Sequence, residues 1–375
     1  MRRWLDNIGL LVAKELRSVM KDVTLVALIL FAFTVAIQLV AHGVRVEVFN
    51  TTVAIIDNDH SELSRRLRAG IQPPYFKPPE DIARADVGDA MDKGRYIFVV
   101  EIPARFEADV LAGRSPTVQI LIDATAMAQA QIGATYFQQI FLSEALDFLH
   151  ARGLVGLVPV KVNSRVVFNP NAQSAWYTSV MQIVTNVTVL SIILVGAAVI
   201  REREHGTIEH LLVMPVRASE IAFAKILANG LVILVAAIAS LWCVVHLMMG
   251  VPLAGSLALF VVAMMLYLFS VTSLGMWMAT MAPSMPQFGL LAVPVYAVAY
   301  LLSGAATPIE SMPLLVKAIA QLLPTTQFVG LAQAVLYRGA GLDVVWPQIL
   351  AISAWGGLFV LLALRRFRSM LAQQG

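Results

Sequence analysis

The chain is divided between apolar runs and one long polar segment. Six runs contain no Asp, Glu, Lys or Arg, and they cover residues 23–41, 176–200, 226–249, 257–282, 288–303 and 346–364. A helix rising about 1.5 Å per residue needs about 20 apolar residues to cross a hydrocarbon core about 30 Å thick. The pattern therefore predicts an all-α polytopic membrane protein with six transmembrane helices, of which 288–303 is the shortest.

The first run could also be the apolar core of a cleaved signal peptide. Such a core has about 7–15 apolar residues, whereas 23–41 is longer and follows an amphipathic leader, residues 1–22. We therefore expect an uncleaved anchor.

Residues 42–175 form the polar segment and hold more than half of the charged residues of the chain. Short β-branched or aromatic runs alternate there with helical ones, the former at 52–56, 96–101 and 117–122 and the latter at 61–69, 104–112 and 125–152. This alternation predicts an inserted α/β or α+β domain. Its last helix is long and apolar, so we expect it to pack on the sheet of its own domain.

An acidic cluster follows the first predicted strand, at Asp57, Asp59, His60 and Glu62. These residue types occur in metal sites, but a turn followed by a helix N-terminus rich in acids explains them without a ligand. We expect no metal site here.

The composition and the charge distribution fit a membrane protein. The chain is 58% hydrophobic and 14% charged, whereas soluble domains are about 45–50% apolar and about 25% charged. Lys and Arg are concentrated in 1–22, 201–225 and the tail 365–375, and they are sparse in 250–256 and 304–345. Because basic loops remain in the cytoplasm, we predict that both termini are cytoplasmic and that 42–175 is external. Orientation then explains the net charge of +3 better than nucleic-acid binding does.

Motifs for catalysis are absent from the sequence. No Gly-Lys pair occurs, so the chain has no P-loop, and neither H-E-x-x-H, G-x-S-x-G nor C-x-x-C is found. Within the six runs the only residue among Asp, Glu, Lys, Arg and His is His246, which argues against an ion-driven transporter or an intramembrane enzyme. We expect no enzyme and no cofactor on this chain, so uphill transport would need energy from a partner.

The loop 201–225 is the best candidate for receiving that energy. Gly206 is expected to end the second span, Thr207 to cap a short helix and Pro215 to end it, while Ser219 caps the third span. Ile208, Leu211 and Leu212 would share one face of the short helix, opposite Glu209 and His210. Such a helix could lie in the lipid headgroups, or it could dock in a groove of a cytoplasmic protein.

Several segments closely resemble ABC-2 type transport permeases. The signature lies in 202–215 and continues in 221–225, and further similarity occurs at 168–170, 284–287, 308–313 and 331–341. The resemblance implies a bacterial inner-membrane exporter subunit that forms a dimer with a second copy or a related permease. It also implies separate cytoplasmic ABC ATPase subunits that carry ATP and Mg, and in some systems a periplasmic membrane-fusion adaptor.

The resemblance also assigns roles to positions. Residues 1–22 would form an interfacial helix, and 304–345 external re-entrant helices, with Pro324 between two short helices and Thr326 capping the second. The ATPase-coupling residues would be Arg201, Glu202, Glu204, Gly206, Thr207, Glu209, Leu211, Leu212 and Pro215.

Polar residues in the second and fourth spans are candidates for lining a translocation path. They are Gln182, Thr185, Asn186, Thr272 and Ser273, although interhelical hydrogen bonding is the more common role of such residues. The family favours a hydrophobic or amphipathic substrate, drug-like or lipid-like. The alternative function is a membrane-anchored sensor or assembly scaffold that acts through the external domain.

Overall fold

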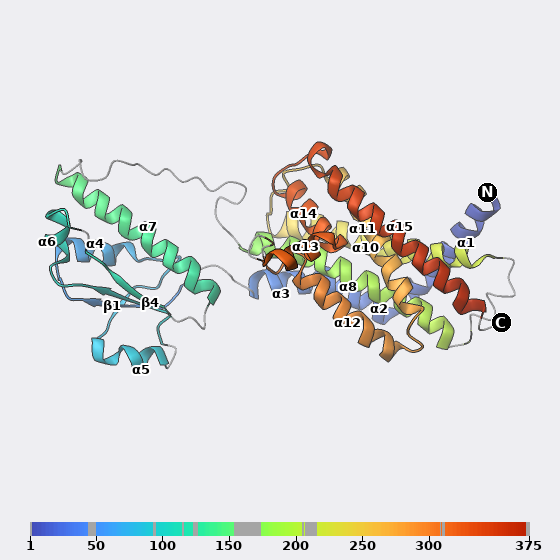
Figure 1. The fold of residues 1–375 in the computed structure, drawn as a ribbon, viewed down its shortest axis with the longest axis horizontal. Coiled ribbons are helices and arrows are strands. Elements are labelled where there is room, and N and C mark those ends of the chain that lie inside the picture. Colours follow the sequence, from blue (N-terminus) through green and yellow to red (C-terminus); the bar gives the residue numbers. More distant parts are fainter. Residues whose placement is uncertain are drawn as a thin grey trace. The chain divides into compact units, whose positions relative to one another are not determined.

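The chain folds into two compact units, which are described separately (Figure 1). Residues 1–43 and 175–375 form a helical unit, and residues 44–174 form an α/β unit. The computed structural model describes residues 2–43, 50–92, 95–114, 116–122, 127–153, 174–204, 206, 216–307, 309 and 312–372.

The α/β unit is built on a mixed four-stranded sheet in the order β2-β1-β3-β4. Its strands are β1 (Val53–Asp57), β2 (Glu80–Asp81), β3 (Phe98–Ile102) and β4 (Gln119–Ile122). The strand β1 pairs in parallel with β2 and β3, whereas β4 pairs antiparallel with β3. Parallel neighbours need helical crossovers, which places helices on both faces of the sheet.

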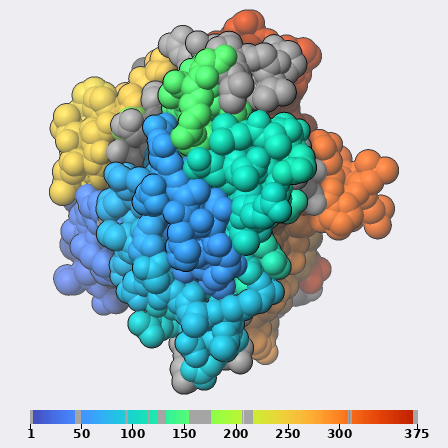
Figure 2. All heavy atoms as spheres, turned by 90° about the vertical axis from the view of Figure 1, so that its left-hand side faces the viewer, coloured from blue at the N-terminus to red at the C-terminus, as the bar shows by residue number. Residues whose placement is uncertain are grey.

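Two layers of helices cover this sheet. The helices are α4 (Glu62–Gly70), α5 (Val87–Asp92), α6 (Phe106–Leu111) and α7 (Met127–Ala151), with a 3-10 turn at Arg84–Asp86. On one face, Phe137 of α7 stacks on Phe76 and packs edge-on against Phe98. On the other face, Val87 and Ala90 of α5 pack against β1 and β3. Figure 2 looks onto this unit and shows the blue spheres of the α4 region beside the teal spheres of α7.

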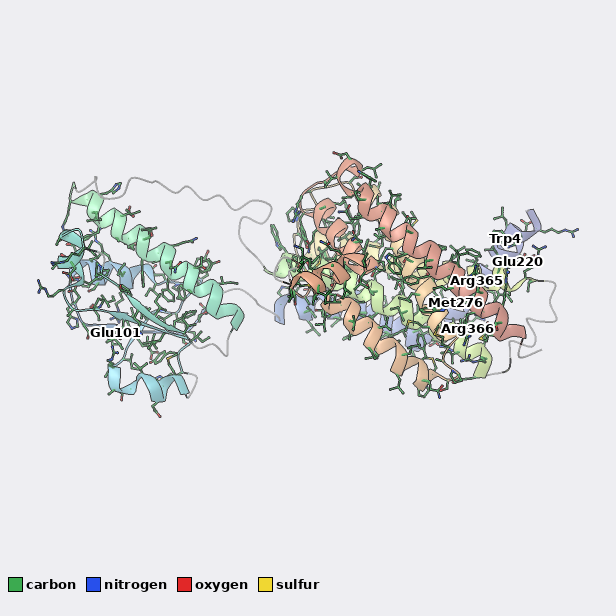
Figure 3. The ribbon with its side chains drawn as sticks, in the orientation of Figure 1. Trp4, Glu101, Glu220, Met276, Arg365 and Arg366 are labelled. Carbon is green, nitrogen blue, oxygen red and sulfur yellow. The ribbon has the colours of Figure 1, made fainter. Side chains whose placement is uncertain are left out.

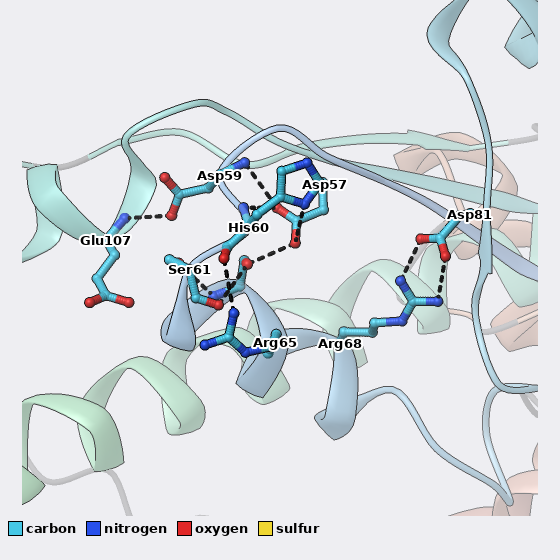
Figure 4. A network of polar contacts seen from close by, with 9 residues as sticks. Asp57, Asp59, His60, Ser61, Arg65, Arg68, Asp81 and Glu107 are labelled. Carbon is cyan, nitrogen blue, oxygen red and sulfur yellow. Dashed lines mark hydrogen bonds and ion pairs between the residues drawn. The ribbon is translucent and has the colours of Figure 1, made fainter.

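The acidic cluster after β1 forms a hydrogen-bonded turn (Figure 4). One oxygen of Asp57 accepts from the backbone N–H groups of Asp59 and His60, both at 3.0 Å, and the other accepts from the Ser64 hydroxyl at 2.7 Å. Burial raises the pKa of Asp57, but these hydrogen bonds outweigh it and hold the pKa below its usual value. Asp59 accepts from the backbone N–H of Glu107 at 3.0 Å. The interpretation of this cluster as a turn before a helix is thus confirmed.

Most elements of the α/β unit lie near the ranges given by the sequence pattern, and two elements were missed. Three strands and three helices lie within a few residues of those ranges, and the last helix packs on the sheet. The strand β2 consists of two exposed acidic residues, and α5 is a six-residue helix within the polar stretch 80–92. Neither has the apolar periodicity from which strands and helices are predicted.

The helical unit contains the long apolar helices. Its elements are α1 (Arg2–Lys21), α2 (Val23–Phe33), α3 (Val35–Gly43), α8 (Ser174–Glu204), α10 (Ala218–Ala239), a π-helical continuation at Ser240–Met248, α11 (Leu257–Ala279), α12 (Met285–Leu301), α13 (Leu314–Leu322), α14 (Pro324–Leu336) and α15 (Leu342–Ala372).

Five spans in the described part of the chain are long and apolar enough to cross a membrane. They are Val23–Gly43, Ala175–Glu204, Ala218–Met248, Leu257–Ala279 and Leu342–Met370. The helix α12 is shorter, with 17 residues, and α13 and α14 form a pair bent by 85°. Several helices extend beyond the predicted runs because helical hydrogen bonding continues into the charged flanking residues. The count of six spans is still a prediction.

Hydrogen bonds define the two ends of the helical unit. At one end, Glu204 of α8 accepts from the backbone N–H of Met285 at 3.1 Å. At the other end, the Tyr177 hydroxyl donates to the carbonyl of Gly304 at 3.2 Å, and the Tyr337 hydroxyl donates to the carbonyl of Trp176 at 3.0 Å. Thus α12 runs between the two ends, whereas the segment that contains α13 and α14 begins and finishes at the same end.

The basic segments lie together at the first of these ends (Figure 3). Trp4 of α1, Glu220 of α10 and both Arg365 and Arg366 of α15 are labelled there. This is the arrangement expected if the leader, the loop 201–225 and the tail face one compartment.

Two predicted helix caps are wrong. Arg217, not Ser219, is the N-cap of α10, and Ser219 lies within its first turn. The helix α14 begins at Pro324, which places Thr326 inside the helix, where its hydroxyl donates to the Leu302 carbonyl at 3.0 Å. In the second case proline at the first helical position sets the start of the helix.

Candidate functional site

The loop predicted to contact the ATPase is held between two structured stems. The first stem is the end of α8, which finishes at Glu204 and is followed by Gly206 with φ of +69°. The second is the start of α10, where Glu220 accepts from the backbone N–H of Arg217 at 2.7 Å. The candidates Thr207, Glu209, Leu211, Leu212 and Pro215 lie outside the described residues.

A charge cluster, buried at Lys225 and Glu15 and half-exposed at Lys14, joins the two stems to each other and to α1. We call Lys14, Glu15, Glu202 and Lys225 the stem quartet. The ammonium of Lys225 lies 2.8 Å from Glu202 Oε2 and 3.0 Å from Glu15 Oε1, and only 1% of its side chain is exposed. The ammonium of Lys14 lies 2.9 Å from the other oxygen of Glu202. Each of the helices α1, α8 and α10 therefore contributes at least one charge.

The four charges compensate each other. Removing an ion from water is costly unless it is paired and hydrogen-bonded, and Lys225 also donates to the Ala198 carbonyl at 3.3 Å. Two cations and two anions give the quartet no net charge. Partial burial lowers the pKa of Lys14, but the hydrogen bonds and charges of Glu202 and Glu15 outweigh burial and raise it above its usual value.

Further contacts attach α1 along the stems. The Asn7 amide donates to Glu220 at 3.3 Å, and the rings of Trp4 and Phe223 meet edge to face with centroids 5.8 Å apart. Arg201 of the first stem lies 2.8 Å from Asp22, which joins α1 to α2. The amphipathic leader is thus bound to both stems.

The first stem also contacts the helices of the C-terminal half. The Arg203 guanidinium donates to the carbonyl of Ala282 and lies 3.6 Å from the sulfur of Met370. Glu204 accepts from the N–H of Met285, at the start of α12. Of the predicted coupling residues, Arg201, Glu202 and Glu204 are therefore engaged in contacts within the chain.

Comparisons with known proteins identify the family to which these stems belong. A sequence model of the ABC-2 family transporter proteins matches residues 23–365, which is most of the chain. The chain belongs to this family. It is 47% identical over 367 residues to the inner membrane transport permease YhhJ of Escherichia coli (strain K12), covering 98% of both chains.

More distant relatives are similar over nearly the same length. The probable multidrug ABC transporter permease YbhR of the same strain is 28% identical, over 90% of this chain and 92% of the relative. The permease YbhS is 24% identical over 93% of both chains. This ABC-2 family member is therefore a multi-pass membrane permease of an ABC transporter.

In this permease, two path-lining candidates form a hydrogen-bond chain to the first span. The Gln182 amide donates to Asn186 Oδ1 at 2.9 Å, and the Asn186 amide donates to the carbonyl of Ala32 at 2.5 Å. The last carbonyls of a helix have no partners within it, and α2 ends at Phe33. The Phe33 carbonyl accepts from the Ser240 hydroxyl, also at 2.5 Å. Both donors satisfy carbonyls at the break between α2 and α3.

The other candidates have different surroundings. Thr272 and Ser273 are fully buried, and their hydroxyls donate to carbonyls of their own helix, those of Leu268 and Phe269, at 2.6 and 2.7 Å. Thr185 is half-buried beside a small hollow that Tyr296 also lines. The five candidates therefore do not share a single described surface.

An apolar pocket of about 390 Å³ lies among α8, α11, α12, α14 and α15. Its lining includes Pro294, Val298, Trp355 and Phe359, and its polar residues are Thr188 and Thr325. The Thr188 hydroxyl is already bonded to the Val184 carbonyl and to Tyr267. The pocket thus suits apolar groups.

Sequence reasoning missed the roles of Glu15 and Lys225. Glu15 lies within the apolar stripe of α1, between the buried residues Ile8, Leu11 and Val19, at helical spacing. An acid in an apolar stripe indicates a buried partner, so this signal was available. Lys225 counts in the sequence as one of the basic residues that orient the chain and as the last residue of the family signature, and neither indicates an ion pair.

Proposed function

We propose that this chain is the membrane-spanning subunit of an ATP-driven exporter in the bacterial inner membrane. The observation that supports this most directly is the loop 205–217, which is held between two stems joined by the buried pair Glu202–Lys225. A loop on such a rigid base transmits force from a bound protein into two membrane helices. Both termini face the cytoplasm in this proposal.

The partner that docks on the loop is a cytoplasmic ABC ATPase, which carries ATP and Mg. The sequence of this permease has no P-loop, so hydrolysis requires a separate subunit. The translocation path forms when the chain pairs with a second copy or a related permease. The α/β unit faces the periplasm, where a membrane-fusion adaptor is a further possible partner.

The substrate class is hydrophobic or amphipathic, drug-like or lipid-like. Two observations support this. The pocket of about 390 Å³ is almost entirely apolar, and two relatives carry the name of probable multidrug ABC transporter permeases. Polar cargo would need hydrogen-bonding groups in the path, whereas Asn186, Thr272 and Ser273 already bond within the chain.

The experiment is affinity purification of the chain from its native membrane in mild detergent, followed by mass spectrometry. We expect a P-loop ATPase to be recovered with the wild-type chain. The variant Glu209→Ala/Leu212→Ala removes an acidic and an apolar contact of the loop, so recovery of the ATPase should fall about tenfold or more, as for loss of interface hot spots. The matched control Leu142→Ala/Glu144→Ala makes the same changes on α7 and should leave recovery unchanged.

Membrane insertion is checked for each variant by its yield and its elution as a single species. Equal recovery of the ATPase from the loop variant and the wild type would contradict a role of the loop in docking. Recovery of no ATPase with folded wild-type protein would contradict the exporter. It would favour a sensor or assembly scaffold that acts through the α/β unit.

A further inference from the structure

The leader helix α1 is attached to the two stems of the loop more extensively than a surface anchor needs to be. An interfacial helix is held by its apolar face in the headgroup region and by electrostatic attraction to lipids. In this chain, Glu15 of α1 instead turns a carboxylate inward to the fully buried ammonium of Lys225, 3.0 Å away. Its neighbour Lys14 reaches Glu202 on the other stem. One short segment of α1 therefore contacts both stems.

The same helix leads directly into the first span. Asp22 ends α1 and caps α2, accepting from the backbone N–H of Leu25 at 3.1 Å through one oxygen. Its other oxygen accepts from Arg201 at 2.8 Å. A displacement of the stems would therefore reach α2 through two routes, the stem quartet and the Arg201–Asp22 pair. Within the stem quartet, the pair Glu15–Lys225 is buried and is consequently less screened by solvent than the Arg201–Asp22 pair.

Breaking a buried ion pair is costly because it leaves an uncompensated charge in an apolar surrounding. If α1 moved relative to the stems, the buried Lys225 would lose Glu15, and Glu202 would lose the half-exposed Lys14. A joint movement of α1 and both stems keeps every pair intact. The energetically favoured movement is therefore that of one rigid body.

We propose that the stem quartet makes α1 part of the coupling machinery, so that α1 and both stems move together and carry the ATPase-driven displacement into the first span. Glu15 and Lys14 are positioning residues in this inference, since they act through the stems and not on the cargo. The inference rests on the proposed function and extends it by naming the residues that transmit the movement.

The test uses a variant, called the disconnected variant, that removes the ion pairs of Lys14 and Glu15 with the stems without leaving an unpaired charge. Lys14→Met/Glu15→Gln removes one cation and one anion, so the net charge of the chain is unchanged. The pair Glu202–Lys225 and the hydrogen bond from Lys225 to the Ala198 carbonyl remain. The matched control is Asp6→Asn/Arg17→Met, which removes the same two kinds of charge from exposed positions on α1.

Three quantities are measured on the full complex in lipid nanodiscs. They are recovery of the ATPase, the permease-dependent rate of ATP hydrolysis, and the change in maleimide labelling of Val23→Cys when ATP and vanadate are added. Val23 is the exposed first residue of α2, next to Asp22, and the labelling experiment uses a Cys243→Ser background because Cys243 is the only cysteine. No transport substrate is required.

We expect Lys14→Met/Glu15→Gln to recover the ATPase normally. The nucleotide-dependent change in labelling at Val23→Cys should fall about tenfold, within the range of coupling free energies between sites. The control variant should behave as the wild type. Equal labelling changes in both double variants would overturn the inference and leave α1 as a passive anchor.

A cross-link distinguishes coupling from simple loss of packing. The amide nitrogen of Asn7 lies 3.3 Å from a carboxylate oxygen of Glu220. Cysteines at these two positions, Asn7→Cys/Glu220→Cys, can therefore be joined by a short bis-maleimide. In the Lys14→Met/Glu15→Gln background, in a chain without the reporter cysteine, this cross-link should raise the permease-dependent rate of ATP hydrolysis toward that of the wild type, because it ties α1 covalently to the second stem. In the wild type the same cross-link should leave hydrolysis unaffected. Loss of hydrolysis there would show that α1 must separate from the stems, which would overturn the inference.

These outcomes separate the two proposals. Failure of the wild-type chain to recover any ATPase refutes the proposed function, and this inference falls with it. Normal recovery together with an unaltered response in the disconnected variant refutes this inference alone. If the disconnected variant does not fold, the cross-linked form decides, and a cross-linked form that folds without a nucleotide response counts against rigid coupling.

Discussion

Asn186 and Thr272 are both buried polar residues of membrane helices, but their hydrogen bonds differ in kind. Thr272 donates to the Leu268 carbonyl of its own helix. Without the hydroxyl, that carbonyl still accepts the backbone hydrogen bond of the α-helix. Asn186 donates to the Ala32 carbonyl of another helix, at the end of α2. Only the second bond connects two elements.

We therefore predict opposite results for two similar substitutions. Asn186→Leu leaves the Ala32 carbonyl without its donor in apolar surroundings, which should cost about 1–3 kcal/mol. Thr272→Val removes a bond within one helix and should change stability by less than about 0.5–1 kcal/mol. The measurement is the thermal unfolding midpoint from intrinsic fluorescence, since all six tryptophans lie in the helical unit.

The pair of variants also tests the role assigned to Asn186. An unchanged midpoint for Asn186→Leu would mean that the side chain does not hold the end of α2, and would return Asn186 to the candidates for the path. Equal decreases of the unfolding midpoint in both variants would show that any polar substitution in the helical unit lowers its stability, whether or not the hydrogen bond joins two helices.

Single residues also show where sequence interpretation succeeds. Gly206 was expected to end the second span, and α8 finishes at Glu204 with Gly206 in the left-handed region, where a side chain is strained. Glu202 was assigned to docking from its position in a motif, whereas the structure pairs it with Lys225. A motif gives a location in the chain, but the direction of a side chain depends on elements far apart in sequence.

At the scale of elements, close packing between helices depends on small residues. A side-chain carbon at Gly275 of α11 would lie 2.9 Å from the Cα and the carbonyl oxygen of Ile192 in α8. Backbone atoms cannot move aside as a flexible side chain can, so α8 and α11 would have to separate. Gly289 of α12, by contrast, would meet nothing within 4 Å.

The same substitution should therefore have opposite signs at the two positions. Gly275→Ala should lower stability by about 1–3 kcal/mol through overpacking. Gly289→Ala should leave it unchanged or raise it by up to about 1 kcal/mol, because alanine favours the helix. Thermal unfolding of both variants in one detergent is the measurement. A loss of stability at Gly289→Ala equal to that at Gly275→Ala would refute the packing argument.

Elements differ in how well the sequence predicts them. The apolar runs predicted the long helices because their signal extends over about 20 residues. The strand β2 is two residues long and exists only because β1 offers it a parallel edge. The break at Thr34 was also missed, since no glycine or proline marks it. The carbonyls before the break accept hydrogen bonds from side chains of α8 and of the π-helical segment. Short elements and breaks depend on tertiary partners, which sequence periodicity does not report.

At the scale of the whole molecule, the number of membrane crossings decides whether both termini face one compartment. Five long helices alone would place the termini on opposite sides. The helix α12 has only 17 residues, about 26 Å at the usual rise, which is somewhat less than a hydrocarbon core about 30 Å thick. It nevertheless runs from Met285, next to Glu204, to the neighbourhood of Gly304, next to Tyr177. A slight local thinning of the bilayer accommodates such a short span.

The bent pair α13 and α14 begins and ends on one side of the unit. Gly304 lies before it and Tyr337 after it, and both contact the start of α8. A bend of 85° between helices of 9 and 13 residues does not give a continuous crossing. We therefore predict that the pair is re-entrant and that α12 is the sixth span, which would return the tail to the side of the leader.

This topology predicts the labelling of single cysteines by an impermeant maleimide in spheroplasts. In a Cys243→Ser background, Ala306→Cys and Arg338→Cys flank the bent pair at exposed positions, and both should be labelled from outside. Arg3→Cys and Arg368→Cys should be labelled only after lysis, because basic segments favour the cytoplasmic side. Opposite labelling of Ala306→Cys and Arg338→Cys would mean that the bent pair crosses the membrane. If Arg368→Cys and Ala306→Cys were both labelled from outside, the chain would have an odd number of spans. The tail would then lie on the opposite side of the membrane from α1 and the two stems, which contact the ATPase in the proposed function.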